Sequence, residues 1–212
     1  MTDSPRVVVR GEAVAEAPPD AADLVVTVEV RDRRRDNALT LLAVRQQELT
    51  ALLDQHRDAL GTVSTEAVSV FPESDGTRVT GSVATTTTRV QLEDVAAAGE
   101  LAVAVAELPD TSLFGPHWRL SRTHPVHRQV RTDAVADAIT RARAYAEALG
   151  CRLTGLVEVR DVGTNGGGIR AAAFSLATTT PTLELQPAAQ EVRGQVEVTV
   201  TMSEPDEEVF QR

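Results

Sequence analysis

Valine alternates with polar residues along several stretches of this 212-residue chain, and this period of two constrains the fold more than any other feature. Residues 6–17, 22–32 and 191–204 all follow it, as is typical of strands that bury one face. The turn signal at residues 18–20 predicts that 22–32 is the antiparallel partner of 6–17. Because 6–17 and 191–204 are terminal and both alternate, we expect them to belong to one sheet.

Three further segments change to the period of an α-helix. They predict helices near residues 36–59, 94–107 and 125–149, with Asp36 as the first N-cap and Gly61 just beyond that helix. The expected buried stripes contain Leu42, Leu49 and Leu53 in the first helix, and Val135, Ile139, Ala142, Ala146 and Leu149 in the third.

The order of these elements predicts the fold class. Asp75-Gly76 is a hairpin signal between β-rich flanks, and the whole order is ββα-ββ-αβαβ-β. This pattern indicates an α+β fold with two sheet-bearing lobes, whose mixed or antiparallel strands are covered by three helices. The expected divisions are a tail at 1–5, a domain at 6–204 with lobes 6–92 and 93–204, and a tail at 205–212.

The charged residues exclude several chemistries. All 21 basic residues are arginine, so a Schiff-base lysine and the lysine of a phosphate-binding P-loop are absent. The net charge of −10 argues against a nucleic-acid partner, because phosphate attraction requires positive charge. Cys151 is the single cysteine, which excludes an intrachain disulfide.

The sequence contains no stretch of membrane-spanning length, and its first thirteen residues lack the apolar core of a signal peptide. We therefore expect no membrane insertion and a cytoplasmic location.

Several stretches together resemble the SIMPL-domain family, a largely bacterial group. They are "VVVRGEAVAEAPPDAADLVVTVEV", "ALTLLAVRQQELTALL", "VSVFPESDGTRVTGSVATTTTRVQLED", "AVADAITRARAYAEALGCRLTGLVEVRD" and "VRGQVEVTVTM", between about Val7 and Met202. The resemblance implies unknown function, relatives that are often exported to the periplasm or envelope, and no agreed catalytic residues. The first thirteen residues do not show the signal peptide expected of an exported relative, so the expectation of a cytoplasmic location differs from what the resemblance implies.

Three histidines, His117, His124 and His127, lie within eleven positions and raise the question of a metal or catalytic site. Pro125 suits the first position of a helix, which places His124 near the N-cap and His127 in the first turn. The spacing fits zinc patterns loosely, and a strand of six residues spans roughly 20 Å, which separates His117 from His124. We therefore expect no metal and no cofactor here.

Other candidate contacts are Trp118 and the glycines of "GTNGGG" at 163–168, which include Gly166, Gly167 and Gly168. Trp118 is expected to pack in the core or, less favourably, to contact an oligomer partner. The glycine segment is expected to be a mobile hairpin or lid.

These features favour a non-enzymatic binding or assembly protein, acting as a homo-oligomer or on a protein partner through its sheet edges. The alternative is a ligand-binding protein or hydrolase-like enzyme. Its pocket would lie between the lobes under residues 163–168, with His124 and His127 as acid-base groups.

Overall fold

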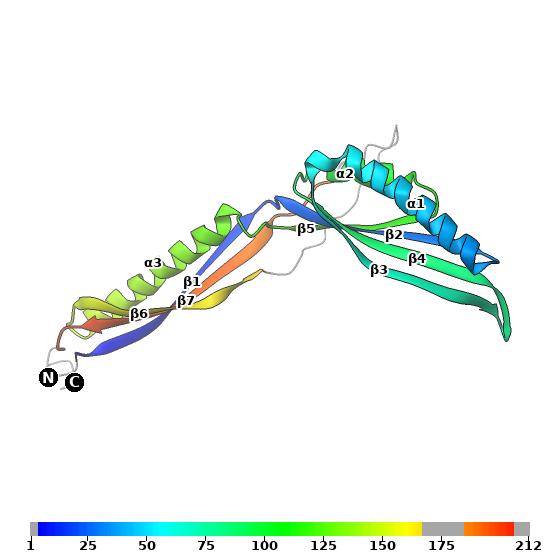
Figure 1. The fold of residues 1–212 in the computed structure, drawn as a ribbon. Coiled ribbons are helices and arrows are strands. Elements are labelled where there is room, and N and C mark those ends of the chain that lie inside the picture. Colours follow the sequence, from blue (N-terminus) through cyan, green and yellow to red (C-terminus); the bar gives the residue numbers. More distant parts are fainter. Residues whose placement is uncertain (1–3, 167–184, 206–212) are drawn as a thin grey trace. The chain divides into compact units, whose positions relative to one another are not determined.

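The computed structural model describes residues 4–166 and 185–205 of the chain (Figure 1). The described residues form two antiparallel sheets and three α-helices, so the fold is α+β as predicted. The chain divides into two compact units. Among the described residues, the first unit contains 4–18, 122–166 and 189–205. The second contains 19–121 and 185–188.

The second unit has a four-stranded sheet with the order β3-β4-β2-β5, covered on one face by two helices. Its strands are β2 (Ala21–Asp32), β3 (Leu60–Asp75), β4 (Arg78–Leu92) and β5 (Thr111–Arg119), and its helices are α1 (Arg35–Gln55), α2 (Ala98–Ala106) and the 3₁₀ turn η1 (Arg57–Ala59). Gly76, at a φ of 61°, opens the β3–β4 turn, which confirms the predicted hairpin.

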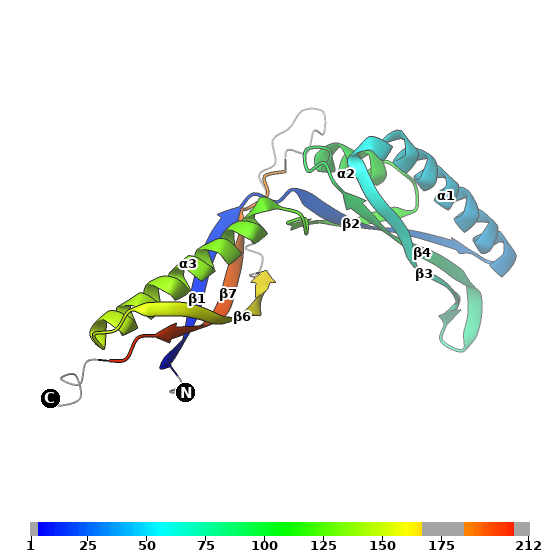
Figure 2. The same ribbon diagram turned by 60° about the vertical axis from the view of Figure 1, so that its left-hand side comes forward.

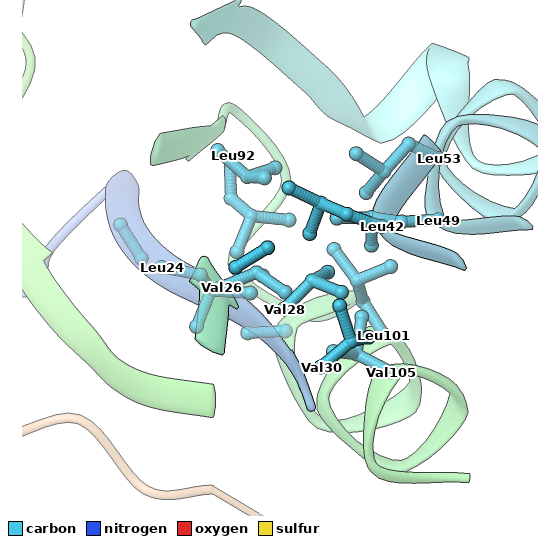
Figure 3. Packing of buried hydrophobic residues seen from close by; sticks show 14 of the residues in the cluster. Leu24, Val26, Val28, Val30, Leu42, Leu49, Leu53, Leu92, Leu101 and Val105 are labelled. Atoms are coloured by element: carbon cyan, nitrogen blue, oxygen red, sulfur yellow. The ribbon is translucent and has the colours of Figure 1, made fainter. Parts of the chain in front are cut away.

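The core of this unit follows directly from the alternation in β2. Leu24, Val26, Val28 and Val30 are at most 1% exposed, and in Figure 3 they point toward leucines of α1 and residues of α2. Each such side chain contributes about 1.5–3 kcal/mol on burial. The predicted α1 stripe of Leu42, Leu49 and Leu53 is buried here and is confirmed.

The first unit is a three-stranded antiparallel sheet with the order β1-β7-β6, covered on one face by α3. The strands are β1 (Arg6–Ala17), β6 (Leu153–Gly166) and β7 (Gln190–Met202), and the helix is α3 (Pro125–Ala148). A Cβ built on Gly11 of β1 would lie 2.0 Å from the Ala134 carbonyl oxygen of α3. Glycine therefore allows the helix backbone to approach the strand closely.

The predicted pairing of residues 6–17 with 22–32 is wrong. β1 pairs with β7 along its whole length, from Arg6 opposite Thr201 to Ala17 opposite Gln190, while β2 pairs with β4 and β5. Tight two-residue hairpins need positive φ in the turn, which Pro18 and Pro19 cannot adopt. The expected lobes, 6–92 and 93–204, also differ from the observed units, because they placed β1 with β2, whereas β1 belongs to the same unit as β7.

Two helix details also differ from expectation. α1 begins at Arg35, where Asp32 Oδ1 accepts a hydrogen bond from the Arg34 N–H (2.7 Å), and it ends before His56, so Gly61 lies in β3. In α3 the buried stripe is Val126, Val130, Ala134, Ala138, Ala142 and Ala146, whereas Val135 is 37% exposed. The small residues spaced by four face the sheet because only they permit the close approach at Gly11.

Candidate interaction surface

The three histidines lie on two different elements. The Nδ1 of His124 accepts a hydrogen bond from the Val126 N–H (3.2 Å), which makes it the N-cap of α3 as predicted, and His127 lies in the first turn. His117 lies in β5, with its ring 4.9 Å from that of Phe114 in an edge-on contact. In the part of the chain that the structure describes, no group of three His, Cys, Asp or Glu residues is placed to hold a metal ion.

Trp118 belongs to the second unit and packs against its hydrophobic core. It lies opposite the buried Ala22, while its neighbour Arg119 bonds Asp23 at 3.1 Å from Nε to Oδ1. Cys151 is 5% exposed and fills a small apolar cluster with Ala146 and Met202, as expected for a buried hydrophobe. Trp118 is half-buried and Cys151 is buried.

The glycine-containing segment is partly strand. Residues 163–166 continue β6, with Gly163 opposite Gln195 and Gly166 opposite Val192, so this part is not the loop that the sequence predicted. Pairing with β7 gives these residues hydrogen-bond partners on one side of the strand. Gly167 and Gly168 lie outside the described residues.

β6 forms one edge of the three-stranded sheet within the described residues. Several of its apolar side chains are uncovered, among them Leu156 (63% exposed) and Val159 (48%), because α3 packs mainly over β1 and β7. Three register shifts interrupt its pairing with β7, between 153 and 155, 156 and 158, and 161 and 163. Bulges of this kind twist an edge and discourage further strand addition.

β1 forms the other edge of the same sheet, beside β7 (Figure 2). Its pairing with β7 has no register shift. Its even-numbered residues are all exposed on the face away from α3. In order along the strand they are Arg6, Val8, Arg10, Glu12, Val14 and Glu16. The charges are therefore antisymmetric about Gly11, because the charged residues before it are basic and those after it are acidic. Val8 and Val14 lie three residues before and after Gly11, and each is 58% exposed.

Asp137 of α3 contacts the middle of this edge. Its Oδ2 accepts hydrogen bonds from the Glu12 N–H (2.9 Å) and from Arg141 Nε (2.9 Å). The Glu12 N–H donation, with desolvation opposing it and Arg141 assisting, holds the pKa of the Asp137 carboxyl below its ordinary value of 3.8. The Glu12 N–H bonds Asp137, so it points away from β7. Because backbone groups alternate between the two sides of a strand, the N–H and C=O groups of the other even-numbered residues also face the outer edge of the sheet.

The β1 residues and Asp137 were not among the sites predicted from the sequence. The antisymmetric charges are visible in "RVVVRGEAVAEA", but they acquire meaning only once β1 is known to be an edge strand. Nothing local in the sequence indicates that Asp137 bonds a residue 125 positions away.

No described helix is both long and apolar enough to cross a membrane. Comparison with known families matches residues 7–200 to SIMPL, described as a protein of unknown function (DUF541). Comparison with curated proteins yields no match.

Proposed function

Because the chain belongs to the SIMPL family, whose description leaves the activity open, we propose its function from its own geometry. The protein is a non-enzymatic assembly protein that forms homo-oligomers by antiparallel pairing of β1 with β1 of a second copy. The observation that carries this proposal is the antisymmetry of the exposed β1 charges about Gly11.

An antiparallel pair centred on Gly11 places every exposed β1 side chain opposite a suitable partner. Arg10 faces Glu12 of the second copy, Val8 faces Val14, and Arg6 faces Glu16; the two-fold axis repeats each pair. Opposite charges and valines directly across an antiparallel pair each contribute roughly 0.2–1 kcal/mol. Shifting the register by two residues would bring like charges together, so the charges also specify the register.

Two other strand edges, β3 and β6, are less suited to pairing with a second copy. β3, an edge of the four-stranded sheet, has acidic charges only, at Glu66, Glu73 and Asp75, so two copies would bring acids together. It also contains Pro72, which has no N–H to donate. β6 has exposed apolar residues but three register shifts.

Charge reversal tests the pairing. Arg10→Glu and Glu12→Arg should each weaken self-association about tenfold, because each turns two attractive pairs into repulsive ones. The double variant R10E/E12R restores opposite charges across the pair and should associate like the parent protein. Light scattering and sedimentation velocity over a concentration series would measure this.

The single variants shift the net charge in opposite directions, so a shared loss excludes a net-charge effect, and the double variant retains −10. A parent protein that stays monomeric, or a double variant that is no better than the singles, would contradict the proposal. Loss of association in Val159→Glu, with the β1 variants unaffected, would assign the interface to β6 instead.

Asp137 must release the Glu12 N–H before a second β1 can bond there. Asp137→Ala should therefore strengthen association. The Nδ1 of His124 is engaged by the Val126 N–H, and the alternative of an acid-base enzyme remains a hypothesis. The cytoplasmic location and the absence of a nucleic-acid partner remain predictions.

A further inference from the structure

One flank of α3 lies at the outer edge of β1, because the Asp137 carboxylate accepts the Glu12 N–H on that side of the strand. A helix turns by about 100° per residue. The residues directly before the buried alanines of α3 therefore share the flank of Asp137, and the residues directly after them lie on the opposite flank. Those alanines are Ala134, Ala138, Ala142 and Ala146. The flank at the β1 edge contains Asp133, Asp137, Arg141 and Tyr145.

The side chains of this flank are available to a partner. Asp133 is exposed and has no ion-pair partner within the described residues. Tyr145 is 57% exposed. Arg141 donates its Nε to Asp137 at 2.9 Å, which leaves the Nη donors of its guanidinium for a second carboxylate.

The position of α3 over the sheet leaves room for a second helix of the same kind. α3 packs over both β1 and β7, since a Cβ on Gly11 of β1 would meet its backbone at 2.0 Å and one on Gly194 of β7 at 2.7 Å. Strands lie about 4.8 Å apart, so a two-fold axis between two β1 strands is about 4.8 Å from the midpoint of β1 and β7. The two α3 axes would then be about 9.6 Å apart, within the roughly 8–10 Å at which helices pack.

We infer that α3 packs antiparallel against α3 of a second copy through this flank, an inference that rests on the β1 pairing proposed above. That pairing places both helices on the same face of the joined sheet. The register follows from Gly11, whose added Cβ would lie closest to Ala134 and Ala138. Asp137 is the flank residue nearest to this point and therefore lies at the two-fold axis. Residues at equal distances before and after it face each other.

The charges of the flank suit this register. Asp133 and Arg141 lie four residues before and after Asp137, so Asp133 of each copy faces Arg141 of the other. Tyr145 faces the exposed Gln129, whose amide can bond the phenol hydroxyl. Each Asp137 keeps the Arg141 of its own helix, which offsets the repulsion between the two carboxylates at the axis. α3 thus carries opposite charges at equal distances from the same axis as β1.

Charge reversal on this flank tests the inference in the full chain. Asp133→Arg should weaken the dimer about tenfold, because both inter-helix ion pairs become repulsive. The double variant D133R/R141D restores opposite charges and should recover most of the parent affinity. Glu147→Arg is the matched control, since it changes the net charge equally on the opposite flank of the same helix, and it should not weaken the dimer. Sedimentation velocity over a concentration series would compare the four proteins.

The outcomes separate this contact from the β1 pairing. Equal affinity of Asp133→Arg and Glu147→Arg, with Arg10→Glu still weakening the dimer, would overturn the α3 contact and leave the β1 pairing in place. A loss in Asp133→Arg that the double variant does not recover would also overturn the α3 contact. A parent protein that stays monomeric would overturn both.

Discussion

Asp137 shows how one side chain can occupy the outer edge of a sheet. Its carboxylate accepts the Glu12 N–H, a backbone donor that would otherwise face water or another strand. Arg141, on the same helix, bonds the same carboxylate at 2.9 Å. The bond therefore links α3 to β1 and also withholds one donor from the edge.

Asp137→Asn should lower the free energy of unfolding by about 1 kcal/mol at pH 7. The amide oxygen still accepts the N–H, but a bond to a charged acceptor is stronger than one to a neutral acceptor. The folded pKa of Asp137 is lowered, so its stabilisation is complete above the ordinary value of 3.8 and is lost as pH falls through the folded value.

Urea denaturation of parent and variant across this pH range would check this, and hydrogen exchange of the Glu12 amide would report the bond itself. The difference between the two proteins should vanish below the folded pKa. A difference that is constant with pH would show that Asp137 acts by packing alone.

Gly11 in β1 determines how closely helix α3 can approach the strand. Gly11→Ala places a Cβ 2.0 Å from the Ala134 carbonyl oxygen and 2.6 Å from the Ala138 nitrogen, both backbone atoms that cannot rotate away. We expect a loss of about 3 kcal/mol or more in the unfolding free energy, because α3 must shift from the sheet.

Gly155→Ala is the matched control in the same sheet. The nearest atom to its added Cβ is Thr201 Oγ1 at 3.1 Å, the end of a side chain that can turn. Hydrogen exchange of the α3 amides should rise strongly in Gly11→Ala and little in Gly155→Ala. Equal exchange in both variants would show that the close approach at Gly11 does not hold the helix.

The elements themselves could be predicted because each carries its own signal. The leucines of α1, the valines of β2 and the Asp75-Gly76 turn specify helix, strand and hairpin from neighbours in the sequence. The buried face of α3 could not be predicted in this way. Hydropathy favoured Val135 and Ile139, while the sheet accepts the alanines because Gly11 and Gly194 bring the backbones together.

At the scale of the whole molecule, the pairing of distant segments decides both the units and the proposed interface. Local patterns suggested that β1 would pair with its neighbour β2, but its partner is β7, nearly 200 residues later in the chain for Arg6. The candidate interface depends on this pairing, since β1 is an edge strand only when β7 occupies its other side. Site residues defined by such long-range pairing leave no local signal.

The net charge of −10 makes self-association of the whole molecule depend on salt. Two copies repel each other over a distance of about 30 Å in 10 mM salt but only about 8 Å in 150 mM. Pairing of β1 with β1 relies on backbone hydrogen bonds, valines and ion pairs in direct contact, which salt screens less than the long-range repulsion. We therefore expect the dimer dissociation constant to fall about tenfold between 10 and 150 mM sodium chloride, equivalent to about 1.4 kcal/mol.

Sedimentation velocity at both salt concentrations would measure this change in the dissociation constant. The R10E/E12R variant is a control of equal net charge and should respond to salt in the same way. If association instead weakens steadily as salt is added, ion pairs alone hold the copies together and a paired β1 edge is excluded.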